Sequence, residues 1–282
     1  MNKVKIICDS TCDLPKELLE ELDVEMSPLQ INFGVSESYY DNELTVDELY
    51  KKVEEKKILP KTSAKTPGEY HELFKKWTDQ GYDVLYTGIG GAISSSHRNG
   101  VMMAEEFDGH VEVFDSQNLS TGIGLLILKA CKFRDQGDDV HEIVRKLNEI
   151  APRVRSQFAI KTMEFLYKGG RCSGVAKLLG TILKIKPVIA VRDGVMSVYG
   201  KPRGKMVIAL DFLLDMLKEA GNNVDPDCIF VTHSKADEEA EYLLPKVKEM
   251  HPEAKVMETK AGCIISTHCG PGTIGILWIN KE

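Results

Sequence analysis

Short apolar runs alternate with amphipathic segments along the first half of the chain. Residues 4–10, VKIICDS, form an apolar run typical of a buried strand, and residues 14–22 follow with apolar positions at helical spacing. The alternation continues in expected strands at 24–33, 83–89 and 111–116 and expected helices at 45–57, 66–77, 94–107 and 120–133. This pattern predicts an α/β fold, with a mostly parallel sheet covered by helices on both faces.

Two of these helices carry a clear start signal. Thr45 with Glu48, and Thr66 with Glu69, fit the capping box, in which each side chain satisfies a free backbone N–H group of the first turn. A proline follows Thr66 at the first helical position, which proline tolerates well. The TSAK segment directly before this second helix is therefore expected to be a loop.

The pattern changes after residues 139–154. Residues 156–160 and 186–200 read as strands, and Asp193 with Gly194 folds the second segment into an antiparallel hairpin. Alternation then returns with strands at 228–234, 254–262 and 273–280 and a helix at 236–250. We expect two α/β domains, residues 1–152 and 153–282, with a mixed sheet in the second.

Composition is that of an ordinary globular protein. The 282 residues are 43% hydrophobic and 28% charged, and a chain of this length suits two domains. The formal charge of −7 argues against a nucleic-acid or anionic-membrane partner, because both favour a surplus of Lys and Arg.

Targeting signals and disulfide patterns are not apparent. The N-terminus lacks the apolar core of a signal peptide, and no run reaches the roughly 18 apolar residues of a membrane span. Seven cysteines, an odd number at scattered positions, do not form a disulfide framework and suit a reducing compartment. We therefore expect a cytoplasmic protein, with Cys8 and Cys131 as small core residues.

A glycine-rich segment follows the expected strand at 83–89. It misses the dinucleotide fingerprint, because Ile93 stands where a third glycine or alanine is needed. Ser94, Ser95 and Ser96 then lie at a helix N-terminus, where free N–H groups favour an anion. Taken alone, this segment favours the simpler interpretation, in which one serine caps the helix.

Basic residues gather in two further glycine-containing loops. Lys201, Arg203 and Lys205 lie between the hairpin and a helix, in a segment that misses the phosphate loop of nucleotide triphosphate sites. Their ordinary interpretation is a solvated turn. Arg171 follows two glycines that are expected to end a short helix, and a rigidly held arginine can grip a carboxylate or phosphate with two hydrogen bonds.

The segment THCGPGTIGI begins at Thr267 and places one histidine beside a glycine-rich turn. His268 is either an incidental loop residue or a donor to an anion held between the domains. The cysteine and histidine spacings do not match known zinc sites, so we expect no metal, and Cys269 has no evident chemical role.

Together these segments resemble the DegV family, the fatty-acid-binding proteins that serve as acyl-carrying subunits of bacterial fatty acid kinase. The resemblance covers essentially the whole chain and depends on an ordered set of motifs: CDSTCDLP, TSAKTP, DSQNLSTGIG, YKGGR and HCGPGTIG. It implies that the fatty-acid carboxylate contacts fall on Thr62, Ser94 and His268, with Arg171 nearby and with Ser63 and Ser95 in the adjoining loops.

The resemblance also implies a role. A separate kinase subunit brings ATP and phosphorylates the bound carboxylate to an acyl phosphate for phospholipid synthesis, so the chain is not catalytic alone and needs no cofactor besides its fatty acid ligand. Arg203, with Lys201 and Lys205, would face the kinase or the phosphoryl group. A peripheral membrane contact would allow ligand exchange.

One departure from the family pattern stands in the serine segment. Where the family usually has Leu-Ser-Gly-Thr-Tyr, this chain has Ile-Ser-Ser-Ser-His from Ile93 to His97, so the serine is kept and the glycine is not. Two other functions are compatible with these residue types. One is a serine hydrolase that uses Ser94, His268 and Asp9, and the other is a lipid sensor that docks to another protein.

Overall fold

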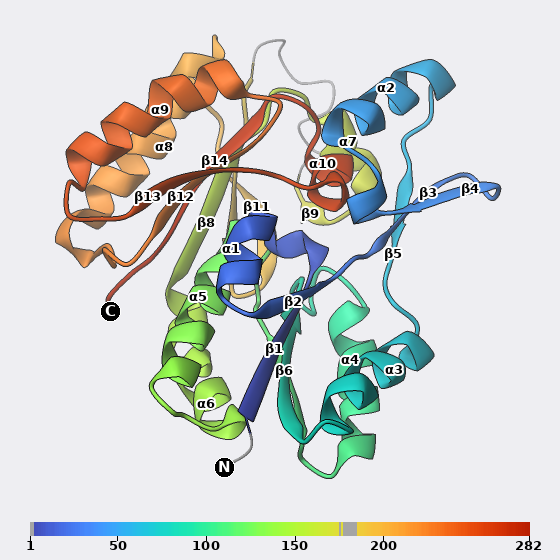
Figure 1. The fold of residues 1–282 in the computed structure, drawn as a ribbon. Coiled ribbons are helices and arrows are strands. Elements are labelled where there is room, and N and C mark those ends of the chain that lie inside the picture. The colour runs from blue at the N-terminus through green and yellow to red at the C-terminus, as the bar shows by residue number, and fades with distance from the viewer. Residues whose placement is uncertain (1–2, 175, 177–184) are drawn as a thin grey trace.

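Three sheets organise the chain, and the structure, a computed structural model, describes residues 3–174, 176 and 185–282. The first sheet is fully parallel, in the order β2-β1-β6-β7, and occupies the lower half of the molecule in Figure 1. Its strands are β1 (Lys3–Asp9), β2 (Val24–Ser27), β6 (Tyr82–Gly88) and β7 (Val111–Asp115). This confirms the parallel sheet predicted for the first half.

Helices cover both faces of this sheet. Tyr70 and Phe74 of α3 pack against Ile7 and Tyr86 on one face, together with residues of α4, and α5 and α6 cover the other face. Both predicted capping boxes are present, at the starts of α2 and α3. The helices of this half are α1 (Lys16–Glu21), α2 (Val46–Lys56), α3 (Pro67–Thr78), α4 (Ser96–Ala104), α5 (Thr121–Asp135) and α6 (Val140–Ile150).

A small antiparallel sheet departs from the sequence-based expectation. It has the order β4-β3-β5, with β3 (Gln30–Phe33), β4 (Glu37–Tyr40) and β5 (Lys61–Ser63). The segment expected as one strand at 24–33 is two strands in different sheets, because Pro28 between them has no N–H to continue a ladder. The TSAK segment, expected as a loop, contributes Thr62 and Ser63 to β5.

The second half forms the predicted mixed sheet, in the order β13-β12-β14-β8-β10-β11-β9. Its strands are β8 (Val154–Ala159), β9 (Cys172–Ser173), β10 (Val188–Arg192), β11 (Val195–Gly200), β12 (Ile229–Ser234), β13 (Val256–Lys260) and β14 (Thr273–Ile279). The predicted hairpin joins β10 to β11, and Asp193 and Gly194 both have positive φ, as a type I′ turn requires.

The described residues of this half include the helices α7 (Glu164–Gly169), α8 (Met206–Ala220), α9 (Asp237–Met250) and α10 (Cys263–Cys269). Figure 1 shows α8 and α9 together on one side of the mixed sheet, whereas α10 lies near the centre of the molecule beside α2 and α7. Among the described residues, no helix combines the length and apolar content that crossing a bilayer requires.

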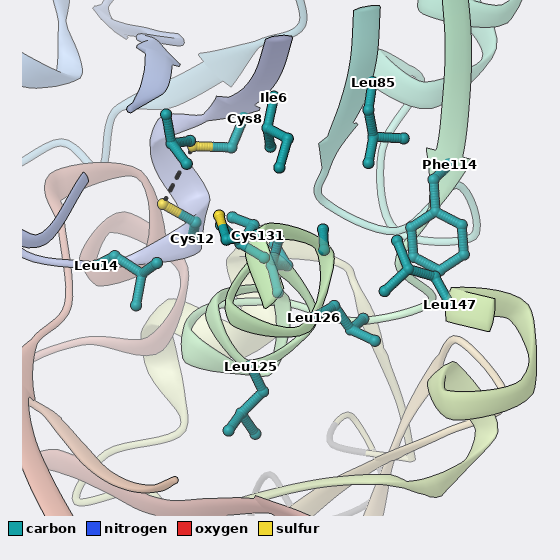
Figure 2. Packing of buried hydrophobic residues seen from close by; sticks show 14 of the residues in the cluster. Ile6, Cys8, Cys12, Leu14, Leu85, Phe114, Leu125, Leu126, Cys131 and Leu147 are labelled. Atoms are coloured by element: carbon teal, nitrogen blue, oxygen red, sulfur yellow. Dashed lines mark hydrogen bonds between the residues drawn. The ribbon is translucent and has the colours of Figure 1, made fainter. Parts of the chain in front are cut away.

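Helix α5 lies between the parallel and the mixed sheet. It contacts β1 and β6 on one side and β8 and β14 on the other, so one apolar cluster runs from Ile6 to Leu277. Figure 2 shows α5 within this cluster, with Cys131 on the helix and Cys8 and Cys12 beside it. The buried thiols of Cys8 and Cys131 confirm these two cysteines as core residues. The division into two domains at residue 152 stays a prediction.

Candidate ligand-binding site

A cavity of about 450 Å³ opens where several strands end. Its wall includes Ile89 directly after β6, Ser120 in the loop after β7, and His233 near the end of β12. In the parallel sheet, the chain passes from β1 to its neighbour β2 on one side. The other neighbour of β1 is β6, so the direction in which strands are added reverses between β1 and β6. This is the kind of switch point where α/β proteins place their ligands, and the volume is within the usual range for a small-molecule site.

All six residues predicted for the head-group region line this one cavity. They come from four separate segments: β5, the loop before α4, the turn after α7, and α10. The six residues are Thr62, Ser63, Ser94, Ser95, Arg171 and His268. The fold therefore brings together side chains that are far apart in the sequence.

His268 lies in the last turn of α10, and not in a loop as one of the two sequence interpretations had it. Gly270 ends this helix with a φ of 79°. The position carries the imidazole to β5, where Nε2 of His268 lies 2.9 Å from Oγ1 of Thr62. The glycine-rich turn after His268 therefore ends α10, the helix that positions this histidine.

The imidazole of His268 is neutral at physiological pH. Burial lowers its pKa to about 4, with a smaller contribution from the positive charge of Arg171. Its Nδ1 atom is buried without a hydrogen-bond partner among the described residues. Gly169 packs closely against it, since a Cβ atom at residue 169 would lie 2.7 Å from Nδ1.

Ser94 combines two roles. Its Oγ accepts a hydrogen bond from the backbone N–H of Ser96 at 3.2 Å, in a turn just before the helix, and the residue also lines the cavity. Ser95, which precedes the first residue of α4, makes no side-chain cap. The side-chain cap that one interpretation predicted is therefore not observed at α4, and the hydroxyl group of Ser94 lies at the cavity wall.

Arg171 follows the predicted helix end. Gly170 adopts φ of 70° after α7, and Nη1 of Arg171 donates to the carbonyl oxygen of Gly169 at 2.6 Å. The guanidinium group is exposed, yet the residue lines the cavity. Its charge is thus held by the turn at the edge of the site.

Two buried carboxyl groups fix the start of α10. Oδ1 of Asp13 accepts from the N–H of Gly262 at 2.8 Å, and Oδ1 of Asp41 accepts from the N–H of Cys263 at 2.8 Å. Burial raises the pKa of Asp13 to about 8 and that of Asp41 to about 6. Sequence reasoning missed both residues, although Asp13 lies in the CDSTCDLP motif.

Side chains from the interior of the mixed sheet and its surroundings form the apolar wall. Phe158 of β8 and Met196 of β11 belong to one buried cluster with Leu119 and Leu166, and all four line the cavity. Ile89 and Ile93 pack against the same cluster. The cavity therefore has a polar wall and an extended apolar wall.

Comparison with known protein families shows that the sequence pattern of the DegV family matches residues 3–281 of this chain. The chain belongs to the DegV family. A DegV domain-containing protein of Clostridium acetobutylicum is 32% identical over 285 residues and is aligned over 100% of both chains. One of Clostridium perfringens is 32% identical over 286 residues, again over 100% of both.

Solved DegV structures share the whole fold. A fatty-acid-binding DegV family protein from Thermus thermophilus superposes with a TM-score of 0.92 at 28% identity, over 99% of this chain and 100% of that one. DegV of Bacillus subtilis, a fatty acid binding protein, gives 0.88 at 26% identity over 100% of both chains. A stearic-acid-binding protein from Eubacterium ventriosum gives 0.87 at 28% identity, over 100% and 99%.

The remaining predicted contacts of this DegV chain lie elsewhere. Lys201, Arg203 and Lys205 occupy the exposed connection from β11 to α8, and none of the three is among the described residues that line the cavity. Arg203 forms an isolated antiparallel bridge with Ile185. The structure does not bring these cations to the head-group residues.

The hydrolase arrangement is not assembled in this DegV fold. The imidazole of His268 bonds to Thr62, whereas the buried Asp9 accepts from Thr11 and from the N–H of Ile89. Within the described part of the chain, no hydrogen bond links His268 to Ser94 or to Asp9. No group of three or more His, Cys, Asp or Glu side chains suited to a metal ion occurs among these residues either.

Proposed function

We propose that this protein binds a long-chain fatty acid, with the carboxylate at Thr62, Ser94 and His268 and the acyl chain along the apolar wall. The observation that carries the proposal is the Thr62–His268 pair in the wall of a largely apolar cavity. The fatty-acid-binding DegV relatives from Thermus thermophilus and Bacillus subtilis support it.

The acyl chain would supply most of the affinity. Each buried methylene contributes about 0.8 kcal/mol, so a long chain gives on the order of 10 kcal/mol before the costs of association and ordering are subtracted. Residues such as Phe158, Leu166 and Met196 offer the apolar contact surface. A ligand held this way would survive purification.

The head group would supply selectivity. A buried carboxylate costs several kcal/mol unless charge-assisted hydrogen bonds replace its water. The Ser94 hydroxyl can donate to it, and the Thr62–His268 pair can donate one further hydrogen: the Thr62 hydroxyl donates when Nε2–H of His268 is given to Thr62, and the imidazole N–H donates in the other tautomer. Arg171 adds a positive charge at the edge of the cavity.

We also propose that a separate kinase subunit phosphorylates the bound fatty acid. A carboxylate oxygen would attack the terminal phosphorus of ATP, the bond from that phosphorus to the bridging oxygen would break, and ADP would leave. The exposed cations Lys201, Arg203 and Lys205 would contact the kinase, whose matching surface would then be acidic. The product would be an acyl phosphate for phospholipid synthesis.

Extraction of the purified protein under denaturing conditions, followed by mass spectrometry, tests the first proposal. We expect near-stoichiometric long-chain fatty acid. A ligand-free protein that also ignores added fatty acid would exclude it. The second proposal predicts acyl phosphate only when a fatty acid kinase and ATP are added, and a loaded protein that yields none with several such kinases would contradict it.

A further inference from the structure

A second concavity adjoins the cavity. It is a cleft of about 570 Å³, and Thr62, Arg171 and His268 line both the cleft and the cavity. Its other walls come from the segment between α2 and β5 and from α7. Two of the three residues proposed to hold the carboxylate, Thr62 and His268, thus also form part of a second recess.

The side chains of this cleft are strongly basic, although the protein as a whole carries a formal charge of −7. Lys57, Lys61, Lys168 and Arg171 line it, and none of the described lining residues is acidic. Lys168 pairs with Glu164 at 2.7 Å, but that pair is exposed and contributes little. Within the described ranges, Lys57 and Lys61 have no ion-pair partner. Four cations, of which only Lys168 has a carboxylate partner among the described residues, favour an anion.

Unpaired polar atoms belong to the same recess. Thr267 is 3% exposed and its Oγ1 has no hydrogen-bond partner among the described residues, and the same holds for Nδ1 of the neighbouring His268. When Thr62 donates to Nε2 of His268, Nδ1 carries the proton and is a donor without an acceptor. Buried donors of this kind normally have acceptors, so two such atoms in one recess indicate a place where an acceptor can bind.

We propose that this cleft binds a phosphoryl group. Its oxygens would accept from the ammonium groups of Lys61 and Lys168, from the guanidinium fork of Arg171 and, after a small adjustment, from Thr267 and His268. The volume exceeds that of a bare ion, so a phosphate that carries a substituent also fits. A role of the bound phosphoryl group in acyl phosphate formation rests on the proposed function. Binding of the phosphoryl group in the cleft does not.

Imidazole NMR of His268 tests the cleft directly. Inorganic phosphate is titrated at pH 7.5 against chloride at equal ionic strength, with His268→Ala used to assign the signal. We expect a saturable shift for phosphate and none for chloride. Equal responses to both anions would overturn the proposal.

Paired lysine variants locate the site. Lys61→Met with Lys168→Met should weaken phosphate binding by about tenfold or more, because two charge-assisted hydrogen bonds are lost. The matched control, Lys218→Met with Lys248→Met, removes the same charge from exposed positions on α8 and α9 and should change it less than about twofold. Equal weakening in both double variants would assign the effect to net charge and refute the cleft.

Vesicles distinguish two sources of the phosphate. A response of His268 to phosphatidic acid in phosphatidylcholine vesicles, but not to inorganic phosphate, would assign a lipid head group to the cleft; a response to inorganic phosphate assigns a soluble phosphoryl group. No response in either arm contradicts the proposal.

Fatty acid content of the Lys61/Lys168 variant should stay unchanged, and a wild-type protein that binds phosphate but no fatty acid would refute only the proposed function.

Discussion

Oγ1 of Thr62 and Nε2 of His268 lie 2.9 Å apart, although 206 residues separate them in the chain. Thr62 belongs to a strand of three residues and His268 to a helix of seven, so neither element holds its position alone. Asp13 and Asp41 anchor the start of the helix, and pairing with β3 anchors the strand. The distance therefore depends on the whole fold and makes the site sensitive to small displacements.

Removal of either member of this pair should weaken the binding of the carboxylate. We expect Thr62→Val and His268→Ala each to lower fatty acid affinity about tenfold, and the double variant to lose less than the sum, since the two groups act together. Competition with a fluorescent fatty acid measures this. The fatty alcohol of equal chain length should bind all variants alike, and parallel losses for acid and alcohol would point to a merely structural pair.

The stability of the protein should depend on pH through the low pKa of His268. Its pKa is about 4 in the folded protein and about 6.5 in an unfolded chain, so its contribution to the free energy of unfolding falls as pH decreases through this interval. Wild type should therefore lose on the order of 2 to 3 kcal/mol relative to His268→Gln between pH 7 and pH 4.

A bound carboxylate should raise the pKa of His268, because a nearby negative charge favours the imidazolium form. NMR titration of the ring with and without fatty acid measures both values. The ring signal of His110, an exposed histidine beside Asp83, serves as the internal reference in both samples. An unchanged His268 pKa in the loaded protein would place the carboxylate elsewhere.

A methyl group at residue 169 should disturb the site without unfolding the protein. In Gly169→Ala the new Cβ would lie 2.7 Å from Nδ1 of His268, so the imidazole must move away. We expect a fatty acid affinity reduced by about tenfold or more, with a midpoint of thermal unfolding that changes little. Gly68→Ala is the control, since nothing lies within 4 Å of its Cβ. Wild-type affinity in Gly169→Ala would show that the ring position is unimportant.

The length of the bound acyl chain should depend on the residues of the apolar wall. Met196 of β11 is 4% exposed and lines the cavity, whereas its neighbour Val195 is 51% exposed. Met196→Trp fills space, and we expect the copurified fatty acids to shift toward shorter chains, at about 0.8 kcal/mol for each methylene excluded. Val195→Trp should leave the mass spectrum of extracted lipids unchanged. The same lipid profile in both variants would place the acyl chain outside this wall.

Local patterns account for the parts of the fold that the sequence predicted. Capping boxes at Thr45 and Thr66 and the hairpin at Asp193 depend on residues within a few positions, so they are visible in a single sequence. Strand β5 escaped prediction because three residues carry no periodicity and its partner β3 lies elsewhere in the chain.

Sequence motifs predicted the residues of the candidate site, but they did not predict the residues that hold these side chains in position. His268 and Arg171 stand in recognisable glycine-rich segments, whereas Asp41 bonds to Cys263, 222 residues away. No pattern in one sequence indicates which N–H group a buried carboxylate will accept from. The basic cleft had no sequence signal either, since Lys61 and Lys168 belong to separate segments that look solvated on their own.

Strand β14 lies in the interior of the mixed sheet, between β12 and β8, although every strand it joins precedes it in the chain. During synthesis the strands on its two sides must wait for residues 273–279 before one continuous sheet can form. Helix α10, which carries His268, comes immediately before β14. A nascent chain thus acquires its ligand site and its central strand in the same late step, so a truncated translation product would expose apolar sheet faces without being able to hold a lipid.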